Sequence, residues 1–489
     1  MATDVRETAG GTPEAQAGEL RRELRFFEAI ALSIAIMAPT AAMALNGTAV
    51  AGLIGRAVPL AFIVATLGVL FVSWGFIRLT RLFNSAGSVL TLTGITLGPR
   101  AGFFAGWALF GTYLGFTVGS VAEIGVFGEA FFAELGTGSP DWILIALVGG
   151  VLVALLSLRE VRGVTRSLLG LEGLSVALIV VLVVIIFVKL FAGSAPEGRE
   201  LTVDVFAPPD GVPFAAVATA AVFGFLSFGG FEGAASLGEE TDNPRRNIPR
   251  AIGTAVVVAG VFYIIVMIAQ ALGFGANEAG ATRFSESSSP LGDLSNDYVG
   301  SWMAVLINFG AMISAFAAGL GAATAASRIL FSLARDAFGG GRVAQTSRVG
   351  APAGALAVIM LIAALALVGL RLGGTSAVNA FFYPGTLGVL LLLVTYLLTN
   401  VGATRFLFFR GERSAPLVEL VFPAVAVVIL VYVLYKNTDP GGLEFPYTIF
   451  PLIAGAWLLA GLAIVLLSPG AARRIGASLV RAEERGSRG

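Results

Sequence analysis

The chain has 489 residues, of which 56% are hydrophobic and only 13% are charged. The hydrophobic fraction exceeds the roughly 45–50% of ordinary soluble domains, which argues against a soluble multidomain enzyme. Lysine plus arginine and aspartate plus glutamate number 31 each, so no net positive field is available for nucleic acid, and we expect no nucleic-acid partner. Cysteine and histidine are absent, so we expect no cofactor, no metal ligands and no catalytic residues of these types, and any proton must move on carboxylates.

Polar segments begin and end the chain. Residues 1–25 lack the short apolar core and the cleavage site of a signal peptide, so they are predicted to form a cytoplasmic tail, as are residues 469–489. Between these tails lie twelve apolar stretches, each of roughly the 20 residues that a helix needs to cross the hydrocarbon core. They lie near 28–55, 58–80, 101–130, 141–158, 164–191, 213–238, 250–273, 301–334, 352–371, 377–402, 416–436 and 447–468.

The positive charges indicate an orientation, because lysine and arginine are retained on the cytoplasmic side of a membrane. With both termini inside, 25 of the 31 positive residues fall in inner segments. The outer segments hold the other six, which are Arg56, Lys189, Arg199, Arg283, Arg371 and Lys436. The pattern therefore predicts a multi-pass protein of the cell membrane, with an even number of spans and cytoplasmic N- and C-termini.

Two of the twelve spans are interrupted near the middle of the membrane. The first carries Pro39 within a run of small residues, and a proline cannot donate a hydrogen bond to the carbonyl of Ala35. The sixth carries Gly229 and Gly230 close to Glu232. Because the first span runs outward and the sixth inward, five-span units that begin with each have opposite topology, as inverted repeats require. Kinks that allow close helix packing are the alternative interpretation.

Matched interruptions of this kind mark a substrate site at the midplane of many transporters. The N–H groups at the start of a half-helix suit a carboxylate, and the free carbonyl groups at the end of a half-helix suit an ammonium or another cation. Together these groups match the backbone of a free amino acid. The two breaks therefore predict a binding site for a free amino acid.

The segment Phe228–Ile252 reads Phe-Gly-Gly-Phe-Glu-Gly-Ala-Ala-Ser-Leu-Gly-Glu-Glu-Thr-Asp-Asn-Pro-Arg-Arg-Asn-Ile-Pro-Arg-Ala-Ile and resembles the sixth-span signature of the amino acid–polyamine–organocation permeases. The segment Ala326–Asp336 is similar to the same family's motif at the end of the eighth span. The resemblance covers essentially all twelve spans. It implies an all-α integral membrane protein with a LeuT-like fold: inverted repeats at 26–191 and 192–402, and two additional helices at 403–468. It also implies alternating access and secondary transport of amino acids or related amines.

Within this resemblance, Glu232 corresponds to the family's glutamate in the Gly-x-Glu element, which lies near the substrate in the arginine/agmatine and polyamine branches. The chain departs from those branches at Leu226, where they have a large aromatic gate, and in the first span, which lacks the Gly-Ser-Gly signature. A buried structural acid bonded to a neighbouring span is the alternative for Glu232. The predicted substrate-binding residues are Ala38, Pro39, Thr40, Ala41, Ala42, Phe225, Leu226, Ser227, Phe228, Gly229, Gly230 and Glu232.

The coupling ion is open between a proton and sodium. Some proton-coupled relatives carry a lysine in the fifth span, and no lysine lies at that place here, where Glu172 is the nearest ionisable group. Ser314 in the eighth span offers a hydroxyl to sodium, although hydroxyls commonly bond to their own helix. Our hypothesis is proton-linked uptake or exchange with Glu232 as the first coupling candidate, followed by Glu123, Glu172 and Ser314. Sodium coupling and a polyamine or other organocation substrate are the alternatives.

An integral-membrane transferase or a channel is the competing class of protein. A transferase generally needs a metal-binding acid cluster, a nucleophile or a large catalytic loop, and the sequence shows none of these and no nucleotide-binding Gly-rich Lys-Ser/Thr motif. Broken helices with a midplane carboxylate favour an occluding site over a continuous pore. We therefore expect a permease for a small molecule in the lipid bilayer rather than an enzyme.

Further candidates for the lining of the substrate pocket are the aromatic residues Trp107, Tyr113 and Tyr383.

Overall fold

The computed structural model describes most of the chain. It covers residues 37–83, 89–159, 162–237, 241–338, 340–347, 351–411, 414–439 and 443–468, and the isolated positions 30, 34, 470, 471 and 474. The expected tail at 1–25 lies outside the described residues, as do all but three positions of the tail at 469–489.

The described residues fold into helices, and no β-strand occurs among them. Ten helical segments of this part of the chain are long and apolar enough to cross a membrane, by length and composition. One of these, Pro39–Leu82, joins two helices across the turn Gly55–Ala57, and Trp142–Ser157 is a shorter apolar helix. The expected all-helical, multi-pass membrane architecture is confirmed, whereas the number of twelve crossings stays a prediction.

Each of the twelve expected apolar stretches overlaps a helix of the structure. The helices are α2 (Pro39–Ile54), α3 (Val58–Leu82), α4 (Val89–Leu97), α5 (Pro99–Glu134), α6 (Trp142–Ser157), α7 (Arg162–Phe191), α8 (Ala216–Ser227), the 3₁₀ helix η4 (Phe231–Leu237), α9 (Pro244–Phe274), α10 (Glu278–Glu286), α11 (Pro290–Tyr298), α12 (Ser301–Phe338), α13 (Ala353–Leu372), α14 (Ala377–Thr404), α15 (Val421–Lys436) and α16 (Phe450–Leu467). The expected spans do not include α4, α10 and α11, because each has only 9 residues, too few to cross a membrane.

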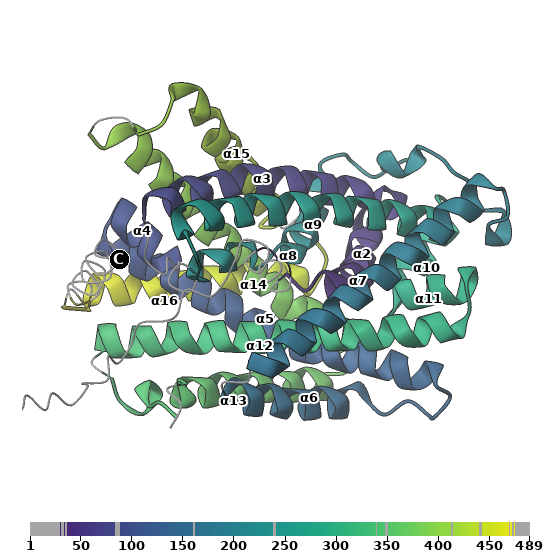
Figure 1. Ribbon diagram of the computed structural model, residues 1–489, viewed down its shortest axis with the longest axis horizontal. Helices are drawn as coiled ribbons and strands as arrows, with labels where there is room; N and C mark the ends of the chain where they lie inside the picture. The colour runs from purple at the N-terminus through teal and green to yellow at the C-terminus, as the bar shows by residue number, and fades with distance from the viewer. Residues whose placement is uncertain are drawn as a thin grey trace, which may run out of the picture.

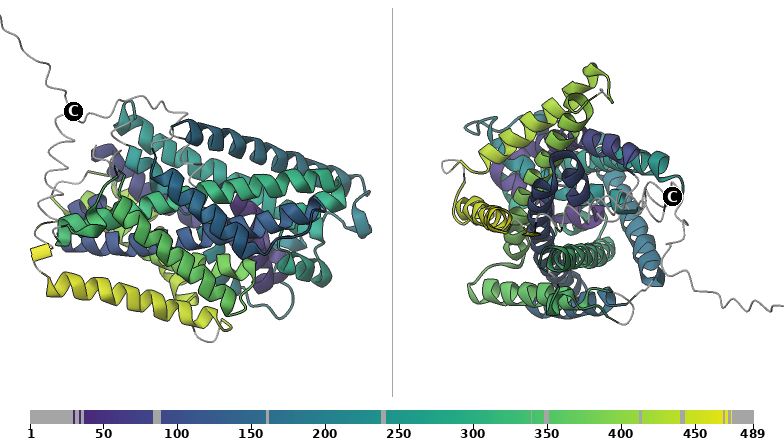
Figure 2. Two further views of the ribbon diagram at one scale, coloured as in Figure 1. Left: turned by 90° about the horizontal axis from the view of Figure 1, so that it is seen from below. Right: turned by 90° about the vertical axis from the view of Figure 1, so that its left-hand side faces the viewer.

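Helix α5 runs through the centre of the bundle and packs extensively against α12 and α14 (Figure 1). The pair α3 and α9 lies on one side of this centre, and the pair α6 and α13 on the other. Helices α15 and α16 lie at the periphery (Figure 2). In the apolar 18-residue stretch of each of these two helices, only 22% of the residues are buried, against 67% for α5. Their leucine and valine side chains are therefore left to face lipid.

Both predicted interruptions are present in the helices. Helix α2 starts at Pro39, and the residue before it, Ala38, has a left-handed backbone with φ 45°. The sixth span is split because α8 ends at Ser227 and η4 begins at Phe231, with Gly230 between them at φ 102°, a conformation that favours glycine. Since α2 packs against α8, the two breaks lie next to each other.

Two short helices, α10 and α11, pack against α2 and are held by an ion-pair cluster. Asp297 accepts hydrogen bonds from Nη1 and Nη2 of Arg283 at 2.7 and 2.9 Å, and from Nη1 of Arg199 at 2.9 Å. The same Nη1 of Arg199 donates to the carbonyl oxygen of Gly273 at the end of α9. The cluster therefore joins α9, α11 and the segment after α7.

Candidate functional site

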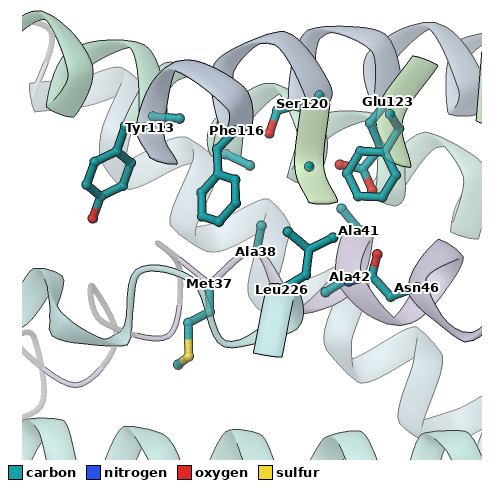
Figure 3. Close-up of a pocket in the computed structure, with 16 residues that line it drawn as sticks. Met37, Ala38, Ala41, Ala42, Asn46, Tyr113, Phe116, Ser120, Glu123 and Leu226 are labelled. Atoms are coloured by element: carbon teal, nitrogen blue, oxygen red, sulfur yellow. The ribbon is translucent and has the colours of Figure 1, made fainter. Parts of the chain in front are cut away.

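A cavity of about 70 Å³ lies beside the two helix breaks. Five helices or their flanking residues enclose it, namely α2, α5, α8, α12 and α14. Its lining residues are Met37, Ala38, Ala41, Ala42, Asn46, Tyr113, Phe116, Gly119, Ser120, Glu123, Leu226, Gly229, Ala318, Ala322, Phe381 and Gly385. Figure 3 shows one side of α5, from Tyr113 to Glu123, facing the start of α2 and Leu226.

Five of the predicted substrate-binding residues line this cavity, and they come from both breaks: Ala38, Ala41, Ala42, Leu226 and Gly229. The other seven do not line it, namely Pro39, Thr40, Phe225, Ser227, Phe228, Gly230 and Glu232. Of the aromatic pocket candidates, Tyr113 lines the cavity, whereas Trp107 and Tyr383 do not. Asn46, Phe116 and Phe381 are lining residues that the sequence analysis does not identify, because no local motif marks them.

The start of α2 is already bonded to side chains of this chain. The backbone N–H of Thr40 donates to Oε1 of Glu172 at 2.9 Å, and that of Ala41 donates to Oγ of Ser314 at 3.2 Å. The next N–H, of Ala42, returns to the carbonyl of Ala38 at 3.0 Å. The N–H groups that the sequence analysis expects to be free for a substrate carboxylate are therefore occupied at these three positions. Glu172 and Ser314, two of the coupling candidates, supply the acceptors at Thr40 and Ala41.

The break in the sixth span is fixed by side chains of two other helices. The hydroxyl of Ser227 donates to the carbonyl of Phe223 at 3.1 Å, and its Oγ accepts from Nδ2 of Asn46 at 2.7 Å. The hydroxyl of Tyr263 on α9 donates to the carbonyl of Ser227 at 3.0 Å. Gly229 N–H bonds back to the carbonyl of Leu226 at 3.0 Å. These contacts hold the end of α8 against α2 and α9.

Glu232 is buried next to the cavity, between two tyrosines. The hydroxyl of Tyr113 on α5 donates to its Oε1 at 3.0 Å, and that of Tyr396 on α14 donates to its Oε2 at 2.8 Å. Because both oxygens accept from neighbouring spans, the geometry matches the alternative of a buried, bonded acid. Glu232 therefore reaches the cavity only through Tyr113, which lines it.

Glu123 is the carboxylate that lines the cavity. Its side chain is only 3% exposed, and its Oε1 has no hydrogen-bond partner among the described residues. On the facing helix α2, Oδ1 of Asn46 is also buried and lacks a partner in the described part of the chain. Buried polar atoms are normally paired, so each of these two oxygens has a capacity to accept a hydrogen bond that the described residues do not use. No group of three or more acidic residues suited to a metal ion occurs in the described ranges.

Comparison with known proteins agrees with the geometry. Residues 28–466 match the amino acid permease family. The low-affinity putrescine importer PlaP of Escherichia coli K12 is 26% identical over 66% of this chain and 69% of its own length. The branched-chain amino acid permease BcaP of Bacillus subtilis strain 168 is 30% identical over 65% of this chain and 68% of its own length. The mitochondrial cationic amino acid transporter 3 of Arabidopsis thaliana is 26% identical over 65% of this chain and 52% of its own length.

The matched family and the three relatives confirm the resemblance that the sixth-span and eighth-span motifs indicate. The helical fold, with its two broken spans around a cavity, fits the LeuT-like architecture that the resemblance implies. The chain belongs to the amino acid permease family of the amino acid–polyamine–organocation superfamily, and is a secondary transporter.

Proposed function

We propose that this chain carries an amino acid or a related amine across the cell membrane by alternating access through the cavity, with protons as the coupling ion. The observation that carries the proposal is the Glu123 carboxylate in a cavity between two broken helices, where its Oε1 has no hydrogen-bond partner among the described residues. Putrescine and branched-chain amino acids, the substrates in the names of two relatives, share an ammonium group. A buried carboxylate is the side chain that pairs with such a group.

The cytoplasmic closure of the cavity is assigned to Glu232 and its two tyrosines. With both termini in the cytoplasm, α14 runs inward from Ala377 to Thr404, so Tyr396 lies on the inner side of the cavity. Tyr396 and Tyr113 both donate to Glu232, and these two bonds join α5, η4 and α14 below the substrate. Inward opening requires these bonds to break. This role supports alternating access between the repeats at 26–191 and 192–402.

The outer closure is assigned to aromatic residues of α8 and α14. Phe381 lines the central cavity, and its neighbour Phe382 lines a second cavity of about 550 Å³ beside the outer half of α14. The rings of Phe381 and Phe382 lie 4.9 Å apart, and the ring of Phe223 lies 5.3 Å from that of Phe382. A substrate that passes from the outer cavity to the inner one must displace this aromatic cluster.

We assign proton coupling to Glu123 first and to Glu232 second. This order reverses the one that the sequence analysis gives. Both oxygens of Glu232 already accept hydrogen bonds, whereas a proton or a substrate ammonium supplies the partner that Glu123 lacks. Two ligands that compete for one carboxylate are thermodynamically linked. Glu172 and Ser314 are the second site of coupling, because opening the start of α2 would release both.

The test is transport by the full-length protein in liposomes, with proton and sodium gradients imposed separately. We expect saturable uptake, counterflow, and accumulation that follows the proton gradient alone. Glu123→Gln should abolish accumulation, whereas Glu129→Gln, on the same helix but outside the cavity, should not. Accumulation driven by sodium would overturn the coupling ion. Flux that neither saturates nor shows counterflow would overturn the carrier itself.

A further inference from the structure

We propose that the cavity selects a small organic ammonium ion that has no carboxylate, in preference to a free amino acid. The inference rests on the proposed transport function and names the substrate class of the same site. It follows from which hydrogen-bonding groups of the cavity are already used within the protein and which are open.

Two acceptors of the cavity lining have no hydrogen bond to the described residues. Oε1 of Glu123 and Oδ1 of Asn46 are buried and without partners among the described residues. The orientation of the Asn46 amide follows from its neighbour: Ser227 donates its single hydroxyl proton to Phe223, so its Oγ must accept from Asn46. The amide nitrogen therefore faces Ser227, and the oxygen is left for a ligand. A carboxylate and an amide oxygen together receive the N–H groups of an ammonium.

Most of the donors near the start of α2 that could bind a substrate carboxylate are already used within the protein. Tyr113 donates to Glu232, and Asn46 donates to Ser227. No lysine or arginine is present among the described residues that line the cavity. The N–H groups of Thr40 and Ala41 donate to Glu172 and Ser314. Among the polar lining side chains, the hydroxyl of Ser120 and the second N–H of the Asn46 amide are the donors without an assigned bond.

The charge at the start of α2 also opposes a second anion. The N-terminus of a helix carries a partial positive charge, which commonly attracts a carboxylate of a ligand. Here Glu172 of α7 supplies that carboxylate from the protein, through its bond to Thr40. An amino acid bound with its ammonium at Glu123 would bring its carboxylate into a cavity with Glu172 and Glu232 nearby and with no lysine or arginine among its described lining residues. Burial of an unpaired charge of this kind is strongly unfavourable.

The rest of the lining suits a short hydrocarbon. Apolar side chains of four helices and of the segment before α2 line the cavity, including Met37, Phe116, Leu226, Ala318 and Phe381. The volume of about 70 Å³ is room for about five water-sized groups. We therefore expect an ammonium ion with a short apolar chain, on the scale of a four- or five-carbon amine.

The decisive experiment compares amines with the amino acids that differ from them only by a carboxylate. The pairs are isobutylamine with valine, isopentylamine with leucine, and putrescine with ornithine. Each compound is tested on the full-length wild-type protein in liposomes, as an inhibitor of exchange and as an exchanged substrate. We expect the amine of each pair to bind at least tenfold more tightly than its amino acid.

The outcomes separate this inference from the proposed function. If an amino acid is exchanged as well as its amine or better, the inference is overturned while the transport function stands. If no compound of either kind shows saturable exchange, both are overturned. Because the comparison uses the wild-type protein, it does not depend on whether a variant folds.

A variant then tests the assigned anchor. Glu123→Gln should weaken binding of each amine at least tenfold, because a neutral amide replaces the carboxylate that pairs with the ammonium. Glu129→Gln serves as the matched control and should leave the affinities within twofold. Equal amine affinity in Glu123→Gln and in the wild-type protein would overturn the role of Glu123.

Discussion

Thr40 and Glu172 lie 132 positions apart in the chain, yet the backbone N–H of Thr40 donates to Oε1 of Glu172 across 2.9 Å. The contact caps α2 directly after the left-handed residue Ala38. Ser314 of α12 accepts from the next N–H, so helices α2, α7 and α12 meet at one point of the broken span. Side chains of two other helices therefore satisfy the first N–H groups of α2, which the sequence analysis expects to be free for a substrate.

Removal of this cap should destabilise the fold. Glu172→Ala leaves the N–H of Thr40 buried without an acceptor, so we expect a loss of about 1–2 kcal/mol in the free energy of unfolding. Glu172→Gln keeps an acceptor oxygen and should lose less. Thermal unfolding of the purified protein in detergent measures both. Equal stability of Glu172→Ala and the wild-type protein would contradict the capping role.

The bond between Tyr113 and Glu232 should hold the cytoplasmic side closed. We expect Tyr113→Phe to open that side more often, because one oxygen of a buried carboxylate loses its donor. Since the chain has no cysteine, Ser120→Cys can report access to the cavity. An impermeant thiol reagent applied to inside-out vesicles should label this cysteine several times faster in the Tyr113→Phe background.

Tyr383→Phe is the control for that measurement, because Tyr383 lies on α14 outside the cavity and packs against Tyr447 and Phe450 by ring contacts. Its labelling rate should match that of the parent with Ser120→Cys alone. Acceleration in the control and not in Tyr113→Phe would be inconsistent with the assigned closure.

Close contact between α5 and α14 should depend on Gly115. A Cβ atom at this position would lie 2.6 Å from the carbonyl oxygen of Pro384 and 3.1 Å from Cα of Gly388. We therefore expect Gly115→Ala to lower the free energy of unfolding by about 1–3 kcal/mol. At Gly321 on α12 no atom lies within 4 Å of the added Cβ, so Gly321→Ala should be neutral or stabilising. Chemical or thermal unfolding of the two variants side by side gives the comparison.

The ion-pair cluster of Asp297 should make the stability depend on acid pH. Burial of Asp297 opposes ionisation, but the bonded guanidinium groups of Arg283 and Arg199 outweigh it and hold the pKa of Asp297 below its ordinary value. A carboxyl with a lowered pKa in the folded state stabilises the fold above its unfolded pKa of about 4, and this contribution disappears as the pH falls further.

Asp297→Asn removes the charge of this cluster. We expect its melting temperature to lie below that of the wild-type protein at neutral pH, and the difference to shrink between about pH 4 and lower values. Melting curves of both proteins across this pH range test the assignment. A difference that stays constant down to the lowest pH would exclude the ionised carboxylate as its source.

Cysteine labelling should also decide the orientation that the charge pattern predicts. Ser194 is exposed in the segment after α7, so Ser194→Cys should react with an impermeant thiol reagent on intact cells. Ser487→Cys, in the C-terminal tail, should react only after the membrane is opened. The reverse pattern would invert the topology and, with it, the assignment of inner and outer closures.

Sequence patterns alone determine the class of protein, the places of the apolar stretches and the two interruptions. These features are local: a run of about 20 apolar residues suffices for a span, and Pro39 or the pair Gly229 and Gly230 weakens a helix at its own position. The motifs at Phe228–Ile252 and Ala326–Asp336 likewise indicate the family without any knowledge of contacts.

Only the tertiary structure decides which acid faces the cavity. In an α-helix the direction of a side chain turns by about 100° per residue, so small differences in the rotation of a helix determine whether a carboxylate meets a cavity or a neighbouring span. The sequence analysis ranks Glu232 first, but packing brings Tyr113 and Tyr396, 119 and 164 positions away, onto its two oxygens. The same packing leaves Oε1 of Glu123 without a partner in the described part of the chain, and α5 turns that side chain towards the broken start of α2.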